Sequence, residues 1–347
     1  MVESVRPLSE RVSAPFELVL PEHSDVALWR AATLQDIDQI WHLMQAMGRV
    51  DHPNYLATRE EVADDFGFTF FDPAVDSLLG FSADGLLLAV GFVTLSPGQR
   101  TLVKSTVAGG VHPEWRARGI GRVLLEWQLG RARQQLASSQ ATLPGWIQSY
   151  ADERAPQCHR LLERAGLTVA RYFVELERVL ADPIRDFELA GGIRLAPYAP
   201  DMSAAVHTAH DEAFADHWSS QPLSDETWNS FIAAETFRPD LSFVVYGTDA
   251  DGHEHVAGYL LSTVSEDDWE GAGFSSSYIA LVGVLREWRG RHIAQALLAA
   301  HLEASRAAGH QRATLDVDTD SPTGAVGLYT GMGFAAAHRE LVFTVEF

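Results

Sequence analysis

The chain has almost no cysteine and no long apolar run, and both absences restrict what it can be. Cys158 is the single cysteine, so an intrachain disulfide and a thiolate metal cluster are excluded. The first residues carry Glu3, Arg6, Glu10 and Arg11 without an apolar core, which does not match a secretory signal peptide. No apolar run approaches the roughly 20 residues that span a bilayer. We therefore expect a cytoplasmic protein in a reducing compartment.

Basic residues are also scarce. Lys and Arg number 26 against 47 Asp and Glu, which gives a formal net charge of −21. Nucleic acid or an anionic membrane would require a broad basic face, so we expect neither as a partner. A phosphorylated ligand needs only a local basic turn, and arginines cluster in two such turns: Arg116, Arg118, Arg286, Arg289 and Arg291.

With 347 residues, the chain suits two domains of ordinary size, and its pattern occurs twice. Each copy has a short strand and a helix, then a hairpin with Asp-Gly at its tip, at Asp84-Gly85 and Asp251-Gly252. A strand, a basic turn and a long helix follow. We predict an α/β fold with a mixed sheet in each of two tandem domains: an N-terminal extension (1–25), a first domain (26–182) and a second domain (183–347).

The periodicity of apolar residues predicts the elements of each copy. In the first copy we expect helices over 59–66, 119–136 and 155–165, and strands over 77–82, 86–96, 104–111, 145–150 and 170–179. In the second we expect helices over 293–308 and 324–329, and strands over 278–284, 313–317 and 341–347.

The two basic turns, VHPEWRARGIGR and VLREWRGRHIAQ, are the predicted ligand sites. Each lies between a strand and a helix, where unpaired N–H groups and the positive end of the helix dipole favour a pyrophosphate. Small residues keep the approach open, although His292 stands where glycine would be easiest. The predicted binding residues are Val111, Arg116, Ala117, Arg118, Gly119, Ile120 and Gly121 in the first turn, and Val284, Arg289, Gly290, Arg291, His292, Ile293 and Ala294 in the second.

These turns, each followed by a long helix, resemble the acyl-CoA loop of the GNAT superfamily of N-acetyltransferases. The segment SPTGAVGLYTGMGF is similar to that superfamily's distal motif, in which a helix carries a tyrosine shortly before a Gly-Phe pair. The resemblance covers nearly the whole chain twice and is strongest to tandem members of the mycothiol synthase type and their actinobacterial relatives. It implies acetyl-CoA as co-substrate and no metal.

The resemblance also implies residue roles. Backbone groups near Val282 and Val284 would hold the pantetheine and polarise the thioester carbonyl, as in an oxyanion hole. Tyr329 would protonate the leaving thiolate. Ser321 lies where the family often has asparagine, and we include it among the cofactor-binding residues.

The first copy departs from the pattern. Aligning Gly166-Leu167 with Gly333-Phe334 places Leu162 opposite Tyr329 and Arg154 opposite Ser321. Leucine cannot donate a proton. We therefore expect catalysis in the C-terminal domain, while the N-terminal domain binds acyl-CoA or only inherits the loop.

The general base and the acceptor pocket stay open at this level. The alignment puts Tyr278 near the position where some family members have glutamate, and carboxylates lie upstream (Glu266, Asp267, Asp268, Glu270) and on the next strand (Asp316, Asp318). His217, Trp218 and Trp228 are candidate acceptor contacts. His207 and His210 have the spacing of metal ligands, but the sequence offers no third ligand.

The predicted function is acetyl transfer from acetyl-CoA to the amine of a small molecule by direct attack. The alternative is a catalytically silent acyl-CoA-binding or scaffold protein. We expect a monomer or homodimer. Aminocyclitols, amino acids, peptides and polyamines all fit as acceptors.

Overall fold

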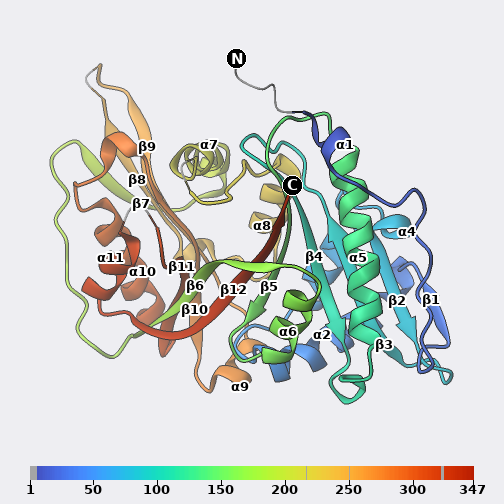
Figure 1. The fold of residues 1–347 in the computed structure, drawn as a ribbon. Helices are drawn as coiled ribbons and strands as arrows, with labels where there is room; N and C mark the ends of the chain where they lie inside the picture. Colours follow the sequence, from blue (N-terminus) through green and yellow to red (C-terminus); the bar gives the residue numbers. More distant parts are fainter. Residues whose placement is uncertain (1–5, 216, 250, 322–323) are drawn as a thin grey trace. The chain divides into compact units, whose positions relative to one another are not determined.

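A computed structural model describes residues 6–215, 217–249, 251–321 and 324–347. Contacts divide the chain into two compact units (Figure 1). Unit 1 comprises residues 1–171 and 340–347, and unit 2 comprises residues 172–339. Each unit contains a mixed α/β sheet, as predicted. Among the described residues, no helix is long and apolar enough to cross a membrane.

The sheet of unit 1 is antiparallel apart from one parallel pair, β4 and β5. Its strands lie in the order β1 (Leu28–Arg30), β2 (Ser77–Phe81), β3 (Leu87–Thr94), β4 (Val103–Val111) and β5 (Gly145–Asp152), followed by residues 340–346 of β12 (Ala335–Glu346). Its helices are α1 (Leu8–Arg11), α2 (Ile37–Asp51), α3 (Arg59–Asp65), α4 (Pro73–Asp76), α5 (Ile120–Ala137) and α6 (Pro156–Arg164).

Unit 2 repeats this arrangement, with β10 and β11 as its parallel pair. Its strands lie in the order β7 (Ile193–Pro197), β8 (Phe243–Thr248), β9 (Glu254–Thr263), β10 (Ser276–Val284) and β11 (Arg312–Asp318), followed by residues 173–179 of β6 (Thr168–Val179). Its helices are α7 (Ser203–Ala213), α8 (Asp225–Ala233), α9 (Asp268–Ala272), α10 (Ile293–Ala307) and α11 (Ala325–Gly331).

The last strand of each sequence copy is counted with the other copy's unit. Residues 173–179 of the first copy pair with β11, and residues 340–346 of the second copy pair with β5. The compact units therefore differ from the predicted domains, 26–182 and 183–347, because each predicted domain includes a last strand that pairs in the other unit. The two ranges stay a prediction of where the sequence repeat begins and ends. A pattern of apolar residues predicts a strand but does not specify which neighbour it pairs with.

The described part of the N-terminal extension, residues 6–25, packs against the first unit. Residues 8–11 form α1, and Leu8 is fully buried in the core of unit 1. Arg11 donates a hydrogen bond to the carbonyl of Phe347 (2.7 Å), which ties the segment to the last strand. The extension is therefore part of the first unit.

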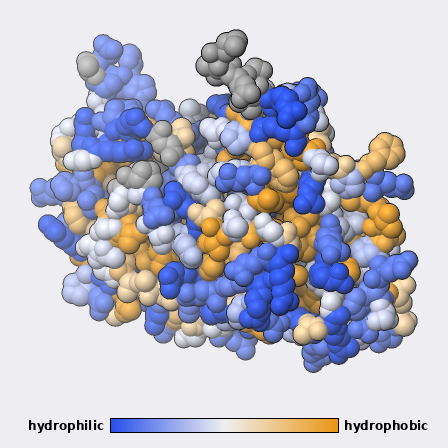
Figure 2. Space-filling view, viewed as in Figure 1, coloured by the Kyte–Doolittle hydropathy of each residue, from blue (hydrophilic) through white to orange (hydrophobic). Residues whose placement is uncertain are grey.

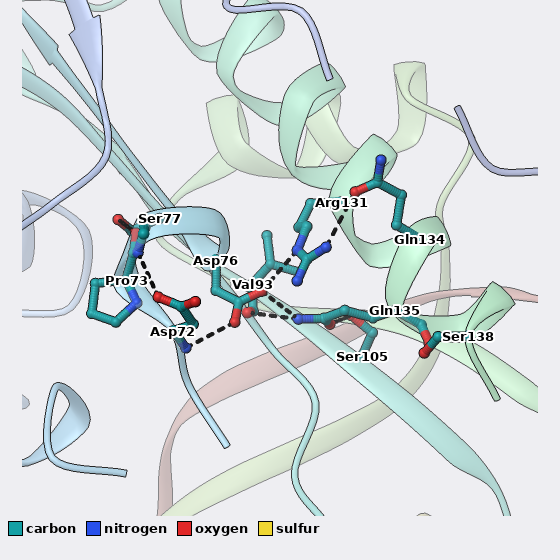
Figure 3. A network of polar contacts seen from close by, with 11 residues as sticks. Asp72, Pro73, Asp76, Ser77, Val93, Ser105, Arg131, Gln134, Gln135 and Ser138 are labelled. Atoms are coloured by element: carbon teal, nitrogen blue, oxygen red, sulfur yellow. Dashed lines mark hydrogen bonds and ion pairs between the residues drawn. The ribbon is translucent and has the colours of Figure 1, made fainter. Parts of the chain in front are cut away.

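A buried polar network fixes the long helix α5 to the sheet of unit 1 (Figure 3). The Asp76 carboxylate accepts hydrogen bonds from Nε of Arg131 (2.8 Å), Nε2 of Gln135 (2.9 Å) and the N–H of Asp72 (3.0 Å). Ser105 on β4 donates to Gln135 (2.7 Å). Because each of these contacts satisfies a polar group away from water, the network orients α5, whose N-terminus forms part of the first basic turn.

On the face viewed in Figure 2, hydrophilic residues are interspersed with apolar ones. The fully exposed Phe16 lies in the segment between α1 and β1. Single exposed apolar side chains of this kind are ordinary and indicate no binding surface by themselves.

Candidate acyl-CoA and acyl-transfer site

The two basic turns have the same backbone conformation. Residues Ala117 and Gly119 of the first turn have φ of 62° and 98°, and Gly290 and His292 of the second have φ of 75° and 60°. His292 therefore adopts the left-handed conformation that the site needs, at a cost of roughly 1–2 kcal/mol for a non-glycine residue. The helices that follow begin at Ile120 and Ile293, so their first N–H groups are free of intrahelical partners.

In the first turn, neighbouring side chains of unit 1 already bind the arginines. Arg116 forms a bidentate ion pair with Asp51, with both N–O distances 2.7 Å. The guanidinium of Arg118 lies 3.9 Å from the carboxylate of Asp25. The ring of His23 forms a hydrogen bond of 2.9 Å with the backbone carbonyl of Arg118. Asp51 thus pairs directly with the charge of Arg116, and Asp25 lies near that of Arg118, so less positive charge is left for a pyrophosphate.

The arginines of the second turn keep the carbonyl and tryptophan contacts that Arg116 and Arg118 also make in the first turn, and the two turns differ in their carboxylate partners. Arg289 donates to the carbonyls of Val284 (3.1 Å) and Ala213 (3.4 Å), and the guanidinium of Arg291 lies 4.7 Å from the centre of the Trp288 ring. No carboxylate in the described part of the chain forms an ion pair with either arginine. Carbonyls orient a guanidinium without cancelling its charge, so this turn keeps its attraction for an anion.

Strands β10 and β11 separate close to their starts. They pair only over residues 276–278 and 312–314, although β10 continues to Val284 and β11 to Asp318. A register shift between Ile279 and Leu281 marks a bulge in the pairing of β10 with β9. The edge of β10 that faces away from β9 is therefore open around Val282, as an oxyanion hole of backbone groups requires.

Unit 1 has the same separation without the bulge. Strands β4 and β5 pair over residues 103–106 and 145–148, and the register of β4 with β3 is continuous from residue 106 to residue 111. Because a bulge re-aims the residues that follow it, the backbone of β4 differs from that of β10 at the point where an acyl group would lie.

Tyr329 lies on α11 and is 7% exposed. Burial raises the pKa of its hydroxyl to about 12, so the phenol keeps its proton throughout the neutral range. The N–H of Phe334 donates to the carbonyl of Tyr329 (3.1 Å), and the N–H of Leu167 donates to that of Leu162 (3.1 Å). The two helix ends therefore coincide, and Leu162 occupies the place of Tyr329 in unit 1.

The structure brings Tyr278, the residue near the position where some family members have glutamate, into contact with the candidate base Asp316. The Tyr278 hydroxyl donates to the Asp316 carboxylate (3.0 Å), directly beside the point where β10 and β11 separate. The neighbouring Ser277 faces the opposite side of the sheet, where it contacts His301 of α10. Tyr278 and Asp316 therefore share the face that α7 covers.

The other carboxylate candidates lie elsewhere. Glu266, Asp267 and Glu270 are exposed on the connection between β9 and β10, which also contains Asp268. Asp318 accepts from the N–H of Asp320 (2.9 Å), and its carbonyl accepts from the N–H of the predicted cofactor-binding Ser321 (3.1 Å), in the turn after β11. Asp318 thus stabilises a turn.

Of the predicted acceptor contacts, Trp228 is a core residue instead. It is 2% exposed, its indole N–H donates to Ser203 (2.9 Å), and its ring stacks on His207 at 4.6 Å. An aromatic residue in a helix predicts either packing or substrate contact, and only its orientation decides. His217 and Trp218 follow α7 and are partly exposed, so they stay candidates.

The structure also shows a polar pair that sequence reasoning did not connect. Nδ1 of His210 on α7 lies 2.7 Å from the hydroxyl of Tyr259 on β9, and both side chains are buried. The spacing of His207 and His210 suggested only a comparison with metal ligands. Among the described residues, no group of three or more His, Cys, Asp or Glu side chains is arranged to hold a metal ion.

Unit 2 thus contains the basic turn, the separated parallel strands and the helix with a buried tyrosine that the sequence predicts for an acyl-CoA site. Residues 203–334 match the model of the acetyltransferase (GNAT) family. This match, together with the relatives described next, shows that the chain belongs to this family, whose members use acyl-CoA, and that it is an acyltransferase enzyme.

Particular relatives sharpen this assignment. The chain is 30% identical over 233 residues to a protein of Thermobispora bispora named mycothiol acetyltransferase, covering 65% of this chain and 70% of the relative. A protein of the same name from Clavibacter sepedonicus is 26% identical over 305 residues, covering 84% of this chain and 90% of the relative.

Solved structures extend the likeness over both units. A GCN5-related N-acetyltransferase from Sphaerobacter thermophilus has a TM-score of 0.69 at 28% identity, covering 94% of this chain and 97% of that one. A tandem GNAT protein from the clavulanic acid biosynthesis pathway has a TM-score of 0.64 at 17% identity, covering 92% and 98%. The tandem GNAT fold predicted from the sequence is thereby confirmed.

Proposed function

We propose that the protein transfers an acetyl group from acetyl-CoA to the amine of a small molecule and that unit 2 carries out this reaction. One observation carries the proposal: among the described residues, unit 2 alone combines a basic turn in which Arg289 and Arg291 have no carboxylate partner, a bulged strand with an open edge, and Tyr329. The family match over residues 203–334 lies within this unit and supports the same assignment.

The pyrophosphate of acetyl-CoA would bind the second turn, with N–H groups from Gly290 to Ala294 as donors and Arg289 and Arg291 as counter-charges. The pantetheine would follow the open edge of β10, where backbone groups at Val282 and Val284 hold the thioester. Separation of the strands at Tyr278 provides the space for it.

Protons then move at two positions. Asp316, oriented by Tyr278, accepts a proton from the attacking amine, directly or through one water. As the carbon–sulfur bond breaks, the Tyr329 hydroxyl donates its proton to the thiolate. The products are an amide and free thiol, and exchange with water restores both side chains.

Unit 1, on this proposal, supports the fold and does not transfer acetyl groups. Its turn is occupied by Asp51, Asp25 and His23, and Leu162 replaces the acid. A phosphate ligand would first have to displace the bidentate pair of Arg116 with Asp51. The Coulomb attraction of that partly buried pair makes displacement unfavourable.

The relatives' name suggests a first acceptor to test. Because those proteins are named mycothiol acetyltransferase, mycothiol without its acetyl group is the appropriate first probe. The net charge of −21 also favours encounter with a cationic amine.

Replacing Tyr329 tests the catalytic role. The Tyr329→Phe variant keeps the ring and removes the proton, so turnover of acetyl-CoA with this acceptor should fall about 10²-fold or more. Affinity for acetyl-CoA should change less than about twofold, because the hydroxyl acts after binding. The measurements are release of free thiol and isothermal titration.

A wild-type protein that binds acetyl-CoA but releases no thiol with des-acetyl mycothiol or a panel of aminocyclitols, amino acids, peptides and polyamines would contradict the proposal. That result would favour a silent acyl-CoA-binding protein.

A further inference from the structure

The His210–Tyr259 pair lies directly under the open part of β10. Tyr259 is the cross-strand neighbour of Gly283, between the two proposed thioester-holding positions, Val282 and Val284. A methyl group added at Gly283 would lie 2.7 Å from both Cε1 and the hydroxyl oxygen of Tyr259. The phenol therefore rests against the bare backbone of the strand.

Aromatic rings of unit 2 pack against His210. His210 stacks on Phe214 with ring centres 4.7 Å apart and lies 5.9 Å from the ring of Trp228. Desolvation lowers the pKa of His210 to about 4, so the ring is neutral at pH 7 and its Nδ1 can accept a hydrogen bond from the Tyr259 hydroxyl. The hydrogen bond of 2.7 Å thus fixes the position of the Tyr259 ring against the backbone of β10.

Unit 1 lacks this pair at the corresponding place. Gly110 of β4 lies opposite Val90 of β3, and a methyl group added at Gly110 would lie 2.9 Å from Sδ of Met47 on α2. The glycine is present in both units, but apolar groups that make no hydrogen bond fill the space beside it in unit 1. A flexible methionine specifies the position of a strand poorly.

We propose that His210 and Tyr259 are positioning residues for acetyl transfer, because their hydrogen bond fixes the backbone of β10 against the thioester carbonyl. This inference depends on the proposed function of unit 2. Neither side chain is exposed to substrate, so both act through Gly283 and its neighbours. Small displacements matter here, because hydrogen bonds to a developing oxyanion lose strength steeply with geometry.

The test compares Tyr259→Phe with Ser277→Ala. Each variant removes one buried hydroxyl: that of Tyr259, which contacts β10 from the side of α7, or that of Ser277 in β10, which faces α10 on the opposite side of the sheet. The carbonyl stretch of bound [¹³C]acetyl-CoA, read by difference infrared spectroscopy, reports polarisation of the thioester without any acceptor.

We expect Tyr259→Phe to shift this stretch toward the value of free acetyl-CoA and to lower kcat with des-acetyl mycothiol about tenfold, while KM for acetyl-CoA changes less than twofold. Ser277→Ala should leave the stretch and kcat at the wild-type values. His210→Gln keeps an acceptor for the phenol and should retain more activity than His210→Leu.

Equal effects of Tyr259→Phe and Ser277→Ala, or a wild-type stretch in Tyr259→Phe, would overturn the inference. Failure of the proposed function has a different signature: Arg289→Gln would then leave acetyl-CoA binding intact. If Arg289→Gln weakens acetyl-CoA binding as the proposed function predicts while Tyr259→Phe behaves as wild type, only the positioning role is wrong.

Discussion

The buried histidine of α10 should make unit 2 sensitive to acid. His301 is fully buried between the carbonyl of Leu241, to which Nδ1 donates (2.9 Å), and the hydroxyl of Ser277, 3.1 Å from Nε2. Because Nδ1 donates to a carbonyl, Nε2 is the acceptor of the neutral ring. A second proton would place a charge away from water and would reverse the contact with Ser277, whose hydroxyl would then have to accept the hydrogen bond.

The magnitude follows from the two pKa values of this histidine. Burial lowers the pKa of His301 in the folded protein from 6.5 to about 4. The unfolded chain therefore binds the proton first as pH falls, and stability decreases between pH 6.5 and 4. At pH 5 the loss from this single group is about 2 kcal/mol, and above pH 7 it vanishes.

Hydrogen exchange of α10 and β10 peptides measures this loss within unit 2, which matters because two units need not unfold together. The matched variant is His301→Gln. The position twelve residues after the turn arginine is Gln128 in unit 1, where the amide donates to the carbonyls of Phe92 (3.1 Å) and Ala108 (2.7 Å). Glutamine cannot titrate. Between pH 7.5 and pH 5, the free energy of protection of these peptides should therefore fall by about 2 kcal/mol less in His301→Gln than in the wild type. The same fall in both proteins would refute the reasoning.

Three further predictions follow from named contacts. Asp316→Asn should lower kcat about 10²-fold at neutral pH, because the amide cannot accept the amine's proton. Tyr278→Phe should have a smaller effect on kcat. Equal rates for Asp316→Asn and the wild type would exclude Asp316 as the base. Because burial raises the pKa of Tyr329 to about 12, the rate should show no loss from deprotonation of this tyrosine up to about pH 10, and a loss near pH 8 that Tyr329→Phe abolishes would contradict this. Asp76→Ala leaves Arg131 without its carboxylate partner and should destabilise unit 1 by about 3 kcal/mol in urea unfolding. The affinity of the folded protein for acetyl-CoA should stay unchanged. An unaltered unfolding midpoint would show that the network contributes little to stability.

Local pattern was sufficient to predict much of the fold. The hairpin at Asp84-Gly85, the helix after each basic turn and the Tyr329 helix depend on neighbouring residues, and the structure has all three. The pairing partners of β6 and β12 could not be predicted, because their sequences predict a strand whichever neighbour they pair with. The packing of α1 was also missed, since a four-residue helix has too short a period to detect.

The site was predictable where it is made of backbone and less so where it is made of side chains. Both turns could be read from their sequences because loop conformation follows from local residues. The occupation of the first turn by His23, Asp25 and Asp51 could not, because these residues lie 65 or more positions before Arg116 and Arg118 in the sequence. The same applies to His210 and Tyr259, which are 49 residues apart.

We propose above all that acetyl-CoA binds at the basic turn of unit 2 and not at that of unit 1. A titration of matched variants tests this most directly. Arg116→Gln and Arg289→Gln remove the same charge from equivalent positions of the two turns. In isothermal titration with acetyl-CoA, the wild type should bind one equivalent, Arg289→Gln should lose about tenfold or more in affinity, and Arg116→Gln should bind as the wild type does. Two equivalents in the wild type, or a loss of affinity in Arg116→Gln alone, would contradict the account.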